Sequence, residues 1–241
     1  MMRLQTIIAI AAVFVAGGSA QTRRSVQPPP GNAANAWMKV AAELPTAPDS
    51  LPAALRYQRD LLFDRQFGGP VLTPQNAQRA AVFEDHLGEG PEIPDVPDRA
   101  VLIATFTDHG SRLTASGRAA YTEITFHVSD VFQDASGHTA PGSDIVVIVP
   151  GGSVKAASGE IISYLTQPRP YFVEPSKTYL LVTQYIPEGD CYFVPKTWDL
   201  SDGVVRANDA VEVQRQHEGR STLIGLTRDQ LVRSLRTRLA R

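Results

Sequence analysis

The chain has 241 residues, 43% of them hydrophobic, and a formal net charge of −2. Proteins that bind nucleic acid through its phosphate backbone carry a dense excess of lysine and arginine, so this balance argues against that class. Cys191 is the only cysteine, which excludes an intramolecular disulfide. No basic residue flanks it to lower its pKa, and we expect a small buried apolar side chain rather than a reactive thiol.

Residues 1–20 have the pattern of a secretory signal peptide. Arg3 gives a positive start, residues 7–15 form an uncharged apolar run, and residues 18–20 are small and precede a cleavage point before Gln21. The run is too short to span a bilayer, and no later run is a candidate. We expect an exported protein, periplasmic or extracellular, with no membrane span after cleavage. Arg3 is the only charged residue removed, so the mature chain carries a charge of −3.

Residues 21–98 are predicted to form a polar leader, a helical extension and a proline-rich linker. Residues 51–67 place leucines at helical spacing and are followed by a Gly-Gly-Pro stop. A weaker helix is predicted over residues 73–86, because proline is favoured at a first helical position. Residues 88–98 are rich in proline, glycine and acidic residues, which no regular element tolerates. The main domain therefore begins after this linker.

Residues 99–208 are predicted to form a β-domain. Short apolar segments are separated by glycine and proline turns without intervening helices, which indicates an antiparallel barrel or sandwich. Residues 145–149 are all β-branched, as expected of a strand buried on both faces. The predicted strands cover residues 100–106, 121–132, 145–149, 154–165, 178–186 and 191–194.

Residues 209–241 are predicted to be a connecting segment followed by a helix. Residues 227–230 form a capping box, and an apolar stripe of Leu231, Leu235 and Leu239 lies opposite several arginines. The stripe can pack on the β-domain, or it can contact a membrane or a partner. The first interpretation is favoured.

Three segments carry a resemblance to a known group of proteins. They read T-E-I-T-F-x-V in residues 122–128, I-V-V-I-V-P-G-G in residues 145–152 and Y-L-L-V in residues 179–182, before a strand that ends in Trp198. Over residues 100–206 the chain resembles uncharacterised exported bacterial proteins with a small OB-like β-barrel of the tissue-inhibitor and netrin type. With the strand pattern, this implies a mainly β fold: an antiparallel five- or six-stranded OB-like barrel with an N-terminal helical extension and a C-terminal helix.

The resemblance implies no activity. The inhibitor families present an N-terminal cysteine held by several disulfides, whereas Gln21 follows the predicted cleavage point here. A shared fold alone does not license a function.

The strand over residues 121–132 carries the candidate binding residues. Tyr121, Glu123, Thr125 and His127 share one face because strand side chains alternate. They could line a binding groove, as the open face of an OB barrel often does. The favoured alternative is the wet face of an antiparallel sheet, polar because it meets water.

Asp108 and His109 are candidate metal ligands at the end of the first strand. The five histidines show no metal-motif spacing. If the two strands are neighbours, these residues with Glu123 and His127 could serve a small metal-dependent or other hydrolase.

We favour a different function and assign no catalytic residue and no cofactor. The expectation is a non-catalytic β-domain that binds or scaffolds an unknown envelope or extracellular protein or ligand, without nucleic acid. Its predicted helices at both ends offer surfaces for docking on such a partner.

Overall fold

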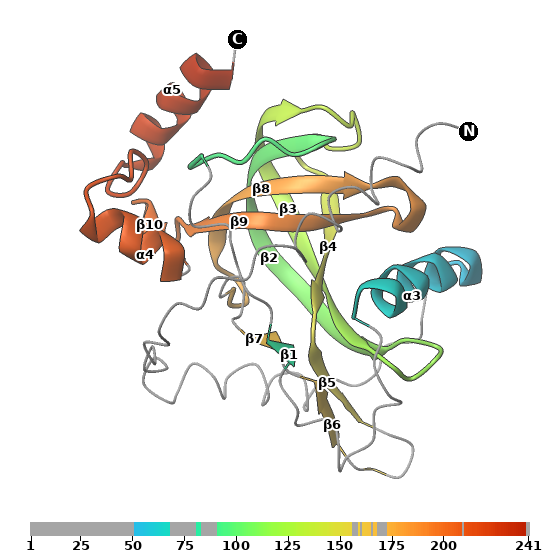
Figure 1. Ribbon diagram of the computed structural model, residues 1–241. Coiled ribbons are helices and arrows are strands. Elements are labelled where there is room, and N and C mark those ends of the chain that lie inside the picture. The colour runs from blue at the N-terminus through green and yellow to red at the C-terminus, as the bar shows by residue number, and fades with distance from the viewer. Residues whose placement is uncertain are drawn as a thin grey trace. The chain divides into compact units, whose positions relative to one another are not determined.

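The computed structural model describes residues 51–67, 81–82, 91–155, 159, 161–164, 166–167, 173–208 and 210–239 (Figure 1). All of them belong to one compact unit. In chain order the elements are α3 (Ala53–Phe67), β1 (Ala81–Val82), β2 (Arg99–Leu113), β3 (Ala120–Asp134), β4 (Asp144–Pro150), β5 (Gly152–Lys155), β6 (Ile161–Tyr164), β7 (Thr166–Gln167), β8 (Thr178–Ile186), η3 (Pro187–Gly189), β9 (Cys191–Asp199), β10 (Arg206–Ala207), α4 (Ala210–His217) and α5 (Arg228–Leu239).

Five strands close into a barrel-like ring. The main sheet has the order β10-β9-β4-β3-β2-β8, and β8 also pairs with β9. The pairings are antiparallel except that of β4 with β9, which is parallel at Val147 and Tyr192. If β2, β3, β4, β8 and β9 are numbered one to five, the order around the ring is 1-2-3-5-4-1, the connectivity of an OB fold. The expected mainly β, OB-like architecture is confirmed.

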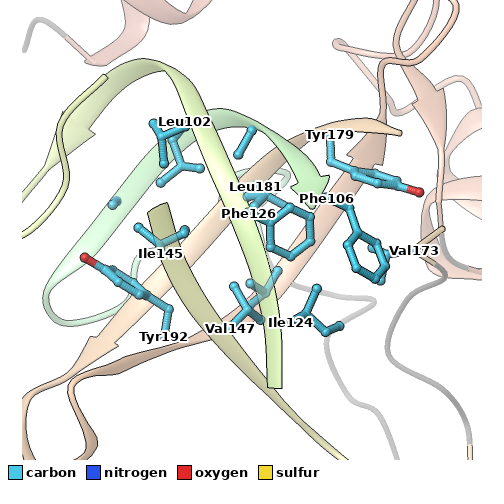
Figure 2. Close-up of a cluster of buried hydrophobic side chains, with 14 of the residues drawn as sticks. Leu102, Phe106, Ile124, Phe126, Ile145, Val147, Val173, Tyr179, Leu181 and Tyr192 are labelled. Carbon is cyan, nitrogen blue, oxygen red and sulfur yellow. The ribbon is translucent and has the colours of Figure 1, made fainter. Parts of the chain in front are cut away.

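The inside of the ring is filled by alternate side chains of its strands. Ile124 and Phe126 of β3 pack with Leu102, Ile145 and Leu181 from the neighbouring strands (Figure 2). The period-two alternation of β3 therefore separates an apolar inner face from a polar outer face, as expected. Strand β4 is covered on both sides, because Ile148 belongs to a second cluster outside the ring.

Helix α5 packs on the outside of the ring through apolar side chains. Leu231 and Leu235 are fully buried with Trp198 and Leu180. The Thr227 backbone N–H donates to Gln230 Oε1 at 2.9 Å, so the predicted capping box is present. The interpretation that the leucine stripe packs on the β-domain is confirmed. In the part of the chain that is described, no helix combines the length and the apolar character needed to cross a membrane.

Helix α4 was not predicted, since its buried face is charged. Glu212 is fully buried, accepts a hydrogen bond from Trp198 Nε1 at 3.1 Å and pairs with the buried ammonium group of Lys196. Both partners lie on β9, so a contact remote in sequence holds α4 in place. The segment is only eight residues long, and its buried positions include Glu212 and Arg215 rather than an apolar stripe.

Two strand and helix predictions differ from the structure. Residues 154–165 do not form one strand: β5 and β6 pair as an antiparallel hairpin instead. Ala81–Val82, inside the weaker predicted helix, form strand β1 and pair in parallel with β7, so the helix prediction is wrong there. The rest of that helix, the leader and the signal peptide lie outside the described residues.

Gly152, the first residue of β5, is required by close packing. Gly151 and Gly152 have φ angles of 94° and 148°, which side chains disfavour. A Cβ atom on Gly152 would lie 2.5 Å from Ser111 Oγ and 2.6 Å from Thr122 Oγ1.

Gly152→Ala should destabilise the protein by about 3 kcal/mol, because it adds a steric clash to backbone strain. Gly137→Ala is the control: its φ is 71°, and a Cβ there meets nothing within 4 Å. That variant should cost about 1 kcal/mol. Urea unfolding measures both, and equal losses would contradict the packing argument.

Candidate functional site

Helix α3 lies against the outer face of β3 with charged residues on its inner side. Arg56 is followed by Arg59 and Asp60 three and four positions later, and these are followed by Phe63 after four and three more, so the four residues share one side of the helix. The exposed fractions of Arg59, Asp60 and Phe63 are 3%, 6% and 0%. Buried charges are costly unless they are paired and hydrogen-bonded, so the sheet must supply partners.

The carboxylate of Glu123 on β3 is the main partner. Its Oε1 accepts hydrogen bonds from Arg56 Nη1 and Arg59 Nη1, each at 2.6 Å. Its Oε2 accepts from Arg56 Nη2 and from Arg112 Nε of β2, each at 3.2 Å. Burial alone would raise the pKa of Glu123, but the bonds from Arg56 and Arg59 outweigh it and hold the pKa below its ordinary value.

Arg59 also binds the turn between β8 and β9. Its Nε donates to the carbonyl of Gly189 and its Nη2 to the carbonyl of Asp190, both at 2.7 Å. Asp190 has a left-handed backbone with a φ of 45°. One planar guanidinium thus joins a carboxylate and two carbonyls, a geometry that the single ammonium group of lysine does not reproduce.

Asp60 and Tyr121 form a second contact between α3 and the sheet. The Tyr121 hydroxyl donates to Asp60 Oδ1 at 2.9 Å, and the Ala115 N–H donates to Oδ2 at 2.9 Å. Burial raises the pKa of Asp60 despite these hydrogen bonds, and burial also raises the pKa of Tyr121. Phe63 stacks on the Tyr121 ring, with centroids 4.5 Å apart. The helix is therefore tied to β3 and to the β2–β3 turn together.

The predicted binding residues of β3 fall into two groups. Tyr121 and Glu123 lie beneath α3, with Glu123 only 15% exposed, so the wet-face interpretation is wrong for these two. Thr125 is half-buried and His127 is exposed. His127 Nδ1 lies 2.8 Å from Asp144 Oδ1 of β4. The structure joins Glu123 to arginines and leaves His127 beside an aspartate.

Asp108 and His109 point to opposite faces of β2. Asp108 pairs with Thr125 and His109 with Ile124. The exposed Asp108 carboxylate accepts the His109 N–H at 2.8 Å, whereas the His109 ring packs edge-on against Phe106. Burial lowers the pKa of His109, against the opposing effect of Asp108. Within the described residues, no group of three or more His, Cys, Asp or Glu side chains could hold a metal ion.

Cys191 is fully buried in the cluster that contains Phe63 and Tyr121. Burial raises the pKa of its thiol to about 12, although Arg59 acts in the opposite direction. A thiol with that pKa is protonated at neutral pH and is a poor nucleophile. The expectation of a buried apolar side chain is confirmed.

Arg56, Arg59, Asp60 and Arg112 were not among the residues singled out from the sequence. The available signal was their spacing, since the first three share one helix side with Phe63. Because the leucines were expected to form the buried side of this helix, the spacing of the charged residues was overlooked. Arg112 of β2 pairs with Tyr121 of β3, and Glu123 lies two positions after Tyr121 on the same face. This strand register, which brings Arg112 to Glu123, is known only from the structure.

Arg59→Ala should lower the free energy of unfolding by about 3 kcal/mol, because it removes one of three guanidinium groups around Glu123 and the donor to the carbonyls of Gly189 and Asp190. It should also increase the rate at which a maleimide labels Cys191, which lies beneath α3. Gln58→Ala, at an exposed position of the same helix, is the control and should change neither quantity. Unchanged labelling in Arg59→Ala would show that this arginine does not hold α3 in place.

The pH dependence of the free energy of unfolding should differ between wild type and Glu123→Gln. The pKa of Glu123 is lowered from 4.5 in the folded protein. The ionised carboxylate therefore stabilises the fold fully above pH 4.5, and this stabilisation is lost as the pH falls through the folded-state pKa. The raised pKa of Asp60 acts in the opposite sense but is common to both proteins. Urea unfolding should show a difference of about 2 kcal/mol at neutral pH that shrinks below about pH 4. A pH-independent difference would contradict a charged Glu123.

Comparison with known proteins gives no relative from which a function can be transferred. No family model and no curated protein matches the sequence. The proposal below therefore rests on the geometry of this chain and on its sequence pattern.

Proposed function

We propose that this chain is an exported, non-catalytic β-domain protein that binds or scaffolds an envelope or extracellular component. The single observation that carries the proposal is the outer face of β3, whose charged residues are arranged for recognition of another segment. Glu123 and the carbonyls of Gly189 and Asp190 together hold a guanidinium group from a helix. Surfaces of this kind bind through charge-assisted hydrogen bonds.

The same face extends beyond α3 to exposed polar residues. His127 and Asp144 lie on the neighbouring strands β3 and β4, with side chains 52% and 62% exposed. In OB folds the face of the second and third strands is a common binding surface. The signal-peptide pattern of residues 1–20 and the resemblance to exported OB-like proteins support an extracytoplasmic partner.

The alternative is a small metal-dependent or other hydrolase that uses Asp108, His109, Glu123 and His127. These residues divide between opposite faces of the sheet, and the Glu123 carboxylate is ion-paired to arginines. No specific observation favours this function over binding. Metal content separates the two, because a stoichiometric ion lost in His109→Ala would support the hydrolase.

Photo-crosslinking in the source cells tests the binding proposal. A photoreactive residue at position 127 should capture one recurrent component, and the same residue at position 218, on the exposed end of the α4 segment, is the control. We expect capture at 127 and none at 218. No recurrent product at 127, together with a metal ion that His109→Ala removes, would contradict a non-catalytic binding role.

A further inference from the structure

Helix α3 occupies the place where OB domains commonly bind ligands. That place is the face of the second and third strands, bordered by the loop between strands one and two and the loop between strands four and five. Here the corresponding parts are β3, the β2–β3 turn and η3 with Asp190. Helix α3 contacts all three, through Glu123, Ala115 and the Gly189 carbonyl.

The contacts select for a particular kind of helix. Glu123 and two backbone carbonyls present only acceptors to Arg59, and Phe63 supplies the stacking contact on Tyr121. A matching helix carries two arginines three positions apart and an aromatic residue four positions after the second. These polar contacts surround an apolar cluster of Phe63, Tyr121 and Cys191. That cluster is separate from the inner core of the ring, so α3 can leave the face without exposing the inner core.

The connection between α3 and the ring is long. Helix α3 ends at Phe67 and β2 begins at Arg99, so residues 68–98 join them. The α3 segment of a second copy offers the same side chains to the same acceptors. Binding within a chain and binding between chains then differ chiefly in effective concentration.

We propose that this face is an exchangeable helix-binding site, and that the α3 segment of a second copy of the chain binds it in place of the resident helix. Two chains then share their helices reciprocally across a two-fold arrangement. This needs no envelope component, so it stands or falls independently of the proposed function.

Two full-length variants test the exchange by complementation. Arg59→Ala keeps an intact face but has a defective helix, whereas Glu123→Gln keeps an intact helix but has a defective face. We expect each alone to be monomeric and their mixture to contain a one-to-one heterodimer in native mass spectrometry. On mixing, maleimide labelling of Cys191 in the Arg59→Ala chain, resolved by its mass, should slow by about tenfold as the helix from the other chain covers it.

The matched control is Arg59→Ala mixed with the double variant Arg59→Ala/Glu123→Gln, which has no intact helix to offer. This mixture should stay monomeric with Cys191 reactive. If the first mixture also stays monomeric while both chains keep native circular dichroism, the exchange is overturned.

A second measurement covers the case in which either variant fails to fold. A protease site placed among residues 68–80 of the otherwise unchanged chain allows α3 to be cut from the ring. After cleavage, heavy-isotope and light-isotope copies should exchange their N-terminal fragments on mixing. Fragments that remain with their original rings would equally overturn the proposal.

Discussion

The carboxylate of Glu123 lies between a sheet and a helix with its side chain only 15% exposed, and its partial desolvation is offset by guanidinium groups. Arg56 and Arg59 each donate to it at 2.6 Å, and Arg59 reaches on to the turn after β8. Removal of either the guanidinium or the carboxylate leaves polar atoms without their partners. The resulting loss of stability is larger than the net stabilisation that the intact pair provides. The position of α3, the burial of Cys191 and the covering of the outer sheet face all depend on this interaction.

The two ends of the domain are held by different physical means. Helix α5 buries Leu231 and Leu235 beside Trp198, and such packing is lost only when the apolar surface meets water. Helix α3 buries Phe63 in a smaller apolar cluster with Tyr121 and Cys191, and charge-assisted hydrogen bonds surround that cluster. The proposed exchange requires another helix to supply the same arginines and the same buried aromatic ring. The C-terminal helix is therefore held by apolar packing, whereas the N-terminal helix is held by apolar and charged contacts together.

The β-domain could be predicted from local patterns, whereas the candidate site could be predicted only in part. Alternation along β3 placed Ile124 and Phe126 inside, and residues 227–230 gave the start of α5, because both signals are local. Glu123 was selected from its strand face, but its partner Arg59 lies 64 positions away and depends on tertiary docking. Helix α4 was missed for the same reason, since Glu212 is buried against Lys196 and Trp198 of β9.

A double-mutant cycle between Arg59 and Glu123 tests the central claim most directly. The free energy of unfolding is measured for wild type, Arg59→Ala, Glu123→Gln and the double variant. If the pair holds α3 on the sheet, the two changes are strongly non-additive, with a coupling of about 2 kcal/mol. Additive losses would show that the two side chains act independently and that the helix is held by other contacts.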